Sequence, residues 1–126
     1  ASGRRRAGIH LGSMLGHVAL PGRSVYAATK HALEGLTKAM ALDLAPHGIR
    51  VNALSPTYIE TPLTKPLLSD LAFRQFVSER MPLSQSERPI GQLQDLDGAL
   101  LFLADSSRSG LITGTSVVVD GGWTAQ

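Results

Sequence analysis

Hydrophobic and polar positions along the chain alternate in a way that predicts strands and helices in turn. Ile9 to Leu11 indicates the end of a buried strand. From Ser24, an expected N-cap, apolar residues recur at helical spacing as far as about Ala45, where Pro46 and Gly48 mark the end of the helix. The apolar stripe of this predicted helix contains Ala32, Leu33, Leu36, Ala39 and Met40.

Four further elements follow in the second half of the chain. Residues 49–54 form a short strand-like run, which Ser55-Pro56 closes. A second helical stretch follows Pro66, and a third spans Gln94 to Ala104. Residues 116–119 contain three consecutive valines and predict a strand buried on both faces. The inward positions of the two helices are expected to be Leu68, Leu71, Ala72 and Phe76, and Leu96, Leu100 and Leu103, respectively.

The order strand, helix, strand, helix, strand predicts a parallel sheet with right-handed crossovers. We therefore expect an α/β fold, part of a doubly wound Rossmann-type parallel sheet with crossover helices. Such sheets bind ligands beyond the carboxyl ends of their strands. Ser13 directly follows the first predicted strand and Pro56 ends the second. Both residues are thus predicted to lie at the edge of the sheet where a site belongs.

The amino-acid composition and net charge exclude several classes of protein function. With 126 residues, 43% of them hydrophobic, the chain can bury the core of one domain. It contains no cysteine, so disulfides and thiolate metal sites are excluded. The four histidines lack ligand spacing, and we expect no metal site. Net charge is +2, and Arg4 to Arg6 is too short a basic run to predict nucleic-acid binding. Without a membrane-length apolar run or a signal peptide, we expect a cytoplasmic protein with no membrane partner.

The chemistry indicated by the sequence centres on Ser13, Tyr26 and Lys30. A phenol keeps its proton until about pH 10, so it is a poor proton-transfer catalyst near neutrality. A cation four residues later on a helix lies one turn along the same face and stabilises the phenolate. A nearby serine hydroxyl could hold a substrate oxygen during proton and hydride transfer. The trio therefore points to interconversion of a carbonyl and an alcohol.

Each of these residues also has an ordinary structural interpretation. A tyrosine and a lysine four apart usually form a partly buried aromatic with a solvated lysine beside it. Ser13 could equally cap a local turn. The neighbouring motifs favour the catalytic interpretation, because they follow in one order: Asn52-Ala53-Leu54-Ser55-Pro56, Thr61-Pro62, Ile112-Thr113-Gly114 and Asp120-Gly121-Gly122. Together with the trio, this order resembles the short-chain dehydrogenase/reductase family from about Ile9 to Trp123.

The resemblance implies an oxidoreductase that uses NAD or NADP and acts on a small-molecule ketone, aldehyde or alcohol. It implies that Tyr26 is the general acid and base, that Ser13 binds the substrate oxygen, and that Lys30 assists Tyr26 and binds the nicotinamide ribose. Cofactor contacts are implied for Tyr26, Lys30, Pro56, Thr57, Ile59 and Thr61. Family members usually carry glycine where this chain has Thr57. For Ile59 and Thr61, a buried apolar residue and a helix cap are compatible with the cofactor role.

Substrate contacts and assembly are also implied by the resemblance. Residues 63–82 correspond to a substrate lid, and the long helix with its small-residue face (Ala28, Ala32, Gly35 and Ala39) corresponds to a surface of homodimers or homotetramers. Candidate substrate contacts are Met14, Leu15, His17, Phe73, Phe76 and Met81, although apolar residues at helical spacing are more often simply packing. Substrate identity and reaction direction are not readable from these residues.

No glycine-rich phosphate loop is found in these 126 residues. The resemblance explains this gap, because family members carry that loop in an amino-terminal half. Residues 1–126 are thus expected to be the carboxyl-terminal part of one Rossmann-type domain, holding its last three strands. The alternative is a catalytically inactive remnant, or an oligomerisation partner of an intact relative.

Overall fold

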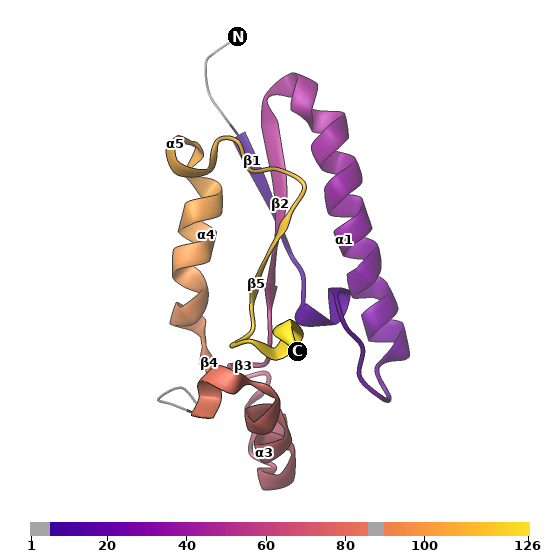
Figure 1. Cartoon of the computed structure of the whole chain (residues 1–126), viewed down its shortest axis with the longest axis vertical. Coiled ribbons are helices and arrows are strands. Elements are labelled where there is room, and N and C mark those ends of the chain that lie inside the picture. The colour runs from indigo at the N-terminus through magenta and orange to yellow at the C-terminus, as the bar shows by residue number, and fades with distance from the viewer. Residues whose placement is uncertain (1–5, 86–89) are drawn as a thin grey trace.

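The computed structural model describes residues 6–85 and 90–126, and it arranges them in three layers (Figure 1). The middle layer is a parallel sheet in the order β1-β2-β5, formed by β1 (Arg6–Leu11), β2 (Ile49–Pro56) and β5 (Ser116–Val119). Helix α1 (Ser24–Leu44) covers one face and α4 (Asp97–Ala104) the other. The predicted α/β class with crossover helices is confirmed.

Strand register aligns the carboxyl ends of all three strands. Leu11 pairs with Leu54 near the end of β1, and Pro56 pairs with Val119 at the end of β5. β2 lies in the centre, and its residues 51–55 are buried. β5 pairs only with β2 among the described residues, so its valines stay partly exposed, and the prediction of burial on both faces was wrong. β1 likewise has one unpaired edge in this part of the chain, where Leu11 is 63% exposed.

The N-cap of helix α1 lies one residue earlier than expected, and the buried face of the helix differs in part from the predicted one. Ser24 is its first residue and Arg23 its N-cap, whereas the predicted end is confirmed, since Gly48 adopts the left-handed conformation (φ 70°). The predicted stripe packs inward in part: Leu33 and Met40 are half-buried, whereas Leu36 is 49% exposed. The buried positions are Ala27, Thr37 and Ala41, small or hydrogen-bonded side chains that let the helix approach β2 closely.

The two later predicted helices are each divided. The stretch after Pro66 forms α2 (Lys65–Leu68) and α3 (Leu71–Arg80), because the Asp70 carboxylate accepts from the Ala72 and Phe73 amides and starts a new helix. The third begins with a 3₁₀ turn, η4 (Leu93–Leu96), before α4. Leu103 is buried as predicted, but Leu100 is 42% exposed. The remaining elements are η1 (Met14–Gly16), η2 (Ala45–His47), β3 (Ile59–Glu60), η3 (Pro82–Gln85), β4 (Gly91–Gln92), α5 (Ser106–Ser109) and η5 (Trp123–Ala125).

A hydrophobic core lies beyond the carboxyl ends of the strands. It joins the turn after β1 to α2, α3 and the last turn of the chain, through Met14, Leu15, Leu68, Val77, Met81, Ile90 and Trp123. The short parallel pair β3–β4, where Ile59 lies opposite Gly91, closes this region. Packing at this edge fixes the loops that follow β1 and β2. No helix in residues 6–85 and 90–126 is long and apolar enough to cross a bilayer.

Candidate functional site

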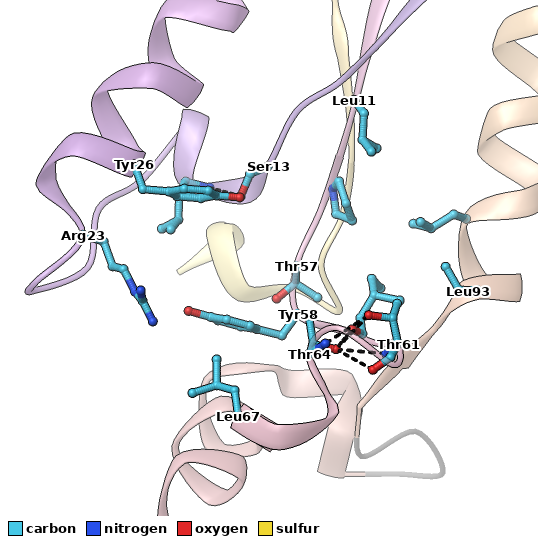
Figure 2. A pocket seen from close by; sticks show the side chains of 14 residues that line it. Leu11, Ser13, Arg23, Tyr26, Thr57, Tyr58, Thr61, Thr64, Leu67 and Leu93 are labelled. Carbon is cyan, nitrogen blue, oxygen red and sulfur yellow. Dashed lines mark hydrogen bonds between the residues drawn. The ribbon is translucent and has the colours of Figure 1, made fainter. Parts of the chain in front are cut away.

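A cavity of about 390 Å³ opens at the carboxyl edge of the sheet (Figure 2). Its wall is formed by the loop after β1, the first turn of α1, the loop after β2 and the start of the segment 63–82. The lining residues are Leu11, Ser13, Leu15, Arg23, Tyr26, Pro56, Thr57, Tyr58, Ile59, Thr61, Thr64, Leu67, Leu93 and Leu96. Most of the predicted catalytic and cofactor-contacting residues therefore share one cavity.

Ser13 is buried between β1 and η1, where its hydroxyl can both accept and donate a hydrogen bond. Its oxygen accepts a hydrogen bond from the Leu15 amide at 3.1 Å, which caps η1. The structural interpretation of this serine as a turn cap is thus realised. A hydroxyl that accepts one bond still has its own proton to donate. Ser13 can consequently cap the turn and donate to a ligand oxygen in the cavity at the same time.

Tyr26 and Lys30 lie one turn apart on α1. The Lys30 ammonium is 5.5 Å from the centroid of the Tyr26 ring, and it donates to the Leu11 carbonyl at 3.5 Å. Tyr26 is 47% exposed and lines the cavity, whereas Lys30 stands behind the ring, outside the lining. The bond to Leu11 links the helix to the carboxyl end of β1. This arrangement places a cation beside the phenol and keeps the phenol open to a ligand.

Thr57 carries a buried hydroxyl that has no hydrogen-bond partner among the described residues. The side chain lines the cavity beside Pro56, at the end of β2. A buried polar atom without a partner costs free energy, and such atoms are rare in folded proteins. A ligand with a polar group at this position would satisfy the hydroxyl.

Ile59 and Thr61 combine packing and polar contacts in the loop after β2. Ile59 is buried, and its carbonyl accepts from the Thr64 hydroxyl at 2.6 Å. Thr61 and Thr64 exchange side-chain to backbone hydrogen bonds at 2.9 and 3.2 Å, which fixes the turn before α2. Ile59 is thus the buried apolar residue of its ordinary interpretation, whereas Thr61 stabilises the turn before α2, whose N-cap is Thr64. Both residues also line the cavity.

Of the predicted substrate contacts, Leu15 lines the cavity and the others lie outside it. Met14 is buried in the core, and Phe73 and Phe76 pack around Tyr58 and Trp123. His17 points to the other side of α1, where its Nε2 lies 3.3 Å from the Glu34 carboxylate. Met81 also belongs to the core.

Two polar cavity residues were missed by the sequence analysis, as were the apolar Leu11, Leu93 and Leu96. Arg23 precedes Tyr26 by three residues, and Tyr58 follows β2. Figure 2 shows the Arg23 guanidinium and the Tyr58 hydroxyl pointing toward each other at one end of the cavity. The spacing of three could have revealed Arg23, since residues i and i+3 share a face where a helix begins.

Burial raises the pKa of the Tyr58 phenol above the ordinary tyrosine value of about 10. The adjacent positive charge of Arg23 offsets part of this rise, and the nearby Tyr26 adds a small increase. Tyr58 therefore remains a hydrogen-bond donor at neutral pH. Within the described ranges, no three histidine or carboxylate side chains gather closely enough to hold a metal ion.

The parallel sheet with flanking helices is Rossmann-like, and the cavity with Ser13 and Tyr26 lies at its carboxyl edge. Residues 2–124 match the family model described as Enoyl-(Acyl carrier protein) reductase. The chain belongs to the short-chain dehydrogenase/reductase family, whose members are oxidoreductases.

Two curated relatives and one solved structure illustrate the match. The chain is 38% identical over 117 residues to carbonyl reductase (NADPH) 2 of Sus scrofa, and 39% identical over 117 residues to L-xylulose reductase of Mus musculus. Each alignment covers 93% of this chain and 46% of the relative. A gluconate 5-dehydrogenase from Burkholderia cenocepacia, solved with NADP and tartrate, superposes with a TM-score of 0.88 at 38% identity. That superposition covers 97% of this chain and 46% of the other. The chain thus spans less than half the length of these relatives.

Proposed function

We propose that this chain supplies the proton-transfer part of an NAD(P)-dependent oxidoreductase that interconverts a small ketone or aldehyde and an alcohol. The observation that carries the proposal is the shared cavity of Ser13 and Tyr26, with the Lys30 ammonium 5.5 Å from the Tyr26 ring. Residues 1–126 would then form the carboxyl-terminal part of one Rossmann-type domain. The remaining part of the site, including a phosphate-binding loop, is assigned to residues outside this chain.

Tyr26 transfers the proton in this proposal. In reduction, its hydroxyl gives a proton to the carbonyl oxygen, while the Ser13 hydroxyl donates a hydrogen bond to the same oxygen. Lys30 stabilises the negative charge that remains on the phenol oxygen. In oxidation, the phenolate takes the alcohol proton, and the Ser13 bond stabilises the charge that develops on the substrate oxygen.

The loop after β2 fits a nicotinamide cofactor, which when bound exchanges a hydride with the substrate carbon. The unpartnered Thr57 hydroxyl can bond a polar group such as a carboxamide. Pro56 and Ile59 offer apolar surface, and Thr61 adds a second hydroxyl in the same wall. Lys30 has further N–H groups for ribose hydroxyls beyond the one directed at Leu11. Neither NAD nor NADP is favoured by these residues.

Two surfaces extend the proposal. Residues 63–82 are assigned to a substrate lid, because Thr64 and Leu67 of this segment line the cavity. The exposed small residues of α1 are assigned to contacts between copies in a homodimer or homotetramer. These residues are Ala28, Ala32, Gly35 and Ala39. The cytoplasmic location expected from the sequence stays a prediction.

The test of catalysis is Tyr26→Phe in the full-length protein that contains this chain. We expect kcat to fall by about 10²- to 10⁴-fold, the usual contribution of a general acid–base group, with cofactor affinity largely retained. Val25→Ala is the control, since Val25 is the neighbouring residue and is 77% exposed. Undiminished turnover of Tyr26→Phe would exclude the assignment.

The alternative is a catalytically inactive remnant, which at most associates with intact relatives. It is motivated by the coverage of less than half of those relatives. Titration of the 126-residue chain with NADH and NADPH separates the two. Saturable binding with a rise in melting temperature supports a functional nicotinamide surface, whereas a full-length protein that neither binds nor turns over supports the remnant.

A further inference from the structure

The cavity contains a positive charge that the proposed proton transfer does not use. Arg23 is the N-cap residue of α1, yet its side chain makes no capping hydrogen bond. It lines the cavity instead, and among the described residues of the lining it is the one that carries a charge at neutral pH. Arg23 is exposed at the mouth of this largely apolar cavity, so its guanidinium is open to an incoming ligand.

That partner is not an acidic residue of the described chain. The ion pairs found within residues 6–85 and 90–126 join His17 to Glu34, Arg74 to Glu60 and Arg108 to Asp105, and Arg23 takes part in none of them. The near neighbour of its guanidinium is the Tyr58 hydroxyl (Figure 2). A guanidinium has five N–H donors, so most of them remain available to a ligand.

Tyr58 gives this end of the cavity a fixed geometry. Its ring packs edge-on against Phe73, with ring centroids 5.3 Å apart, and lies 6.0 Å from Trp123. The aromatic neighbours hold the ring, so its hydroxyl points at Arg23 without needing the guanidinium to place it. Because Tyr58 stays protonated, it adds a neutral O–H donor beside the cationic donors of Arg23.

The position of Arg23 relative to Tyr26 limits the size of the ligand. The two residues are three apart at the start of α1, a spacing that puts side-chain bases about 5–6 Å apart. Both side chains also line the same cavity of about 390 Å³, so one small ligand can contact Arg23 with an anionic group and Tyr26 with its reacting oxygen. Long or bulky substrates with a distant charge do not meet this condition.

Resting on the proposed function, we propose that the substrate is a short hydroxy acid or oxo acid whose carboxylate is bound by Arg23 together with the Tyr58 hydroxyl. Guanidinium matches a carboxylate with two parallel N–H donors. Leu15 and Leu67 line the same cavity, so a bound ligand displaces water from apolar surface there. The lower local dielectric constant then strengthens the contact between Arg23 and the carboxylate. Arg23 and Tyr58 thus determine which substrate is bound, whereas Ser13, Tyr26 and Lys30 carry out the proton transfer.

The experiment compares 3-hydroxybutyrate with its methyl ester, which differs mainly in lacking the charge. With the full-length protein, we expect kcat/KM for the acid to exceed that for the ester by about tenfold or more. Arg23→Gln should remove that preference through a higher KM for the acid, with the ester unchanged within about twofold. Arg23→Lys should retain part of the preference, since it keeps the charge but not the planar fork. NADH and NADPH affinities should not change in either variant.

Several results would overturn the proposal. The first is an equal loss of kcat/KM for acid and ester in Arg23→Gln, the second is an unchanged kcat/KM for both, and the third is weaker binding of the cofactor by this variant. Binding is measured independently of turnover through the fluorescence of Trp123, which lies near Tyr58 and is the one tryptophan of residues 1–126, and Trp123→Phe identifies its signal in the full-length protein. Acid binding that depends on Arg23, without any turnover, would support the carboxylate site and refute the proposed catalysis. Turnover that depends on Tyr26 but not on Arg23 would do the reverse.

Discussion

Lys30 lies one helical turn beyond Tyr26, and its ammonium stands 5.5 Å from the centre of the Tyr26 ring while bonding the Leu11 carbonyl. The bond to Leu11 ties the lysine to the end of β1, the strand that leads directly to Ser13. One side chain therefore connects the helix that carries the phenol with the loop that carries the serine. The residues to which we assign proton transfer are thus held in place by contacts between β1 and α1.

Replacing Lys30 by methionine keeps most of the side-chain length and removes the charge. We expect kcat of the full-length protein to fall by about 10²-fold or more, because the phenol loses the cation that stabilises its ionised form. Steady-state kinetics with a saturating cofactor measures the effect. Lys38→Met is the matched control, since Lys38 lies two turns further along α1 and outside the cavity. Equal losses in both variants would contradict the role of Lys30.

The two roles of Ser13 can be separated by substitution. Ser13→Ala removes the bond from the Leu15 amide and the donor to the substrate, so we expect about 1 kcal/mol lower stability and about 10²-fold lower kcat. Ser13→Thr keeps the hydroxyl, and the extended backbone at this residue (φ −158°, ψ 154°) suits a β-branched side chain. Threonine should therefore restore most of both losses, as measured by urea unfolding and by kcat. Recovery of stability without kcat would show that the serine acts only as a cap.

The close approach of η1 to α1 depends on a glycine. A Cβ on Gly16 would lie 2.9 Å from the Lys30 carbonyl, a backbone atom that cannot move aside without shifting the helix. We expect Gly16→Ala to lower the free energy of unfolding by about 1–3 kcal/mol, as overpacking does. Gly98→Ala is the control, because an added Cβ at that position of α4 meets nothing within 4 Å, and we expect it to raise stability by about 0.5–1 kcal/mol. Urea denaturation of both variants checks the pair.

The sequence predicted the order of the main elements and the trio, because these depend on local patterns. Helix spacing joins Tyr26 to Lys30, and strand ends place Ser13 and Pro56 at one edge. The buried face of α1 could not be predicted, since its inward Thr37 is polar and is satisfied by the Leu33 carbonyl at 2.8 Å and by His10, a residue of β1, at 2.9 Å. Leu36 has the apolar character expected of a core residue but lies on the outer side of the helix.

The same limit applies to the cavity. Arg23 and Tyr58 are 35 positions apart (58 minus 23) and meet only because Tyr58 is held by Phe73 and Trp123 from two other segments. Asn52, by contrast, belongs to one of the sequence motifs but has a structural role in the fold. Its amide donates to the Ile112 carbonyl at 2.9 Å and accepts from the Thr115 amide at 3.2 Å, fixing the start of β5.

Tyr58 should make stability fall at alkaline pH. An unfolded tyrosine ionises near pH 10, whereas burial raises the pKa of Tyr58 in the folded chain. Between these two values the unfolded state binds fewer protons than the folded state, so the free energy of unfolding decreases as pH rises. The contribution is fully present below pH 10 and is lost as pH rises through the folded value.

Urea unfolding between about pH 9 and 11, near the ordinary tyrosine pKa, measures this slope, and Tyr58→Phe should reduce it. Arg23→Gln should raise the pKa of Tyr58 further, because it removes the charge that favours the phenolate. Absorbance titration can follow this change, since the chain contains two tyrosines and Tyr58→Phe identifies the signal. An unchanged titration in Arg23→Gln would show that the two side chains do not interact in solution.

Thr57 offers a test of the nicotinamide surface that does not depend on turnover. Its buried hydroxyl has no partner among the described residues, so replacing it by the similarly shaped valine removes an unsatisfied group. We expect Thr57→Val to leave the free energy of unfolding unchanged or to raise it by about 1 kcal/mol.

If the Thr57 hydroxyl bonds the cofactor, the same variant should bind NADH or NADPH about 5- to 10-fold more weakly, the value of one neutral hydrogen bond. Thr113→Val is the control for a hydroxyl outside the cavity: it removes the bond that Thr113 accepts from the Val51 amide at 3.0 Å, so it should lower the free energy of unfolding by about 1 kcal/mol and leave cofactor binding unchanged. Retained stability with weakened cofactor binding in Thr57→Val alone supports the assignment, whereas unchanged binding would limit Thr57 to a packing role.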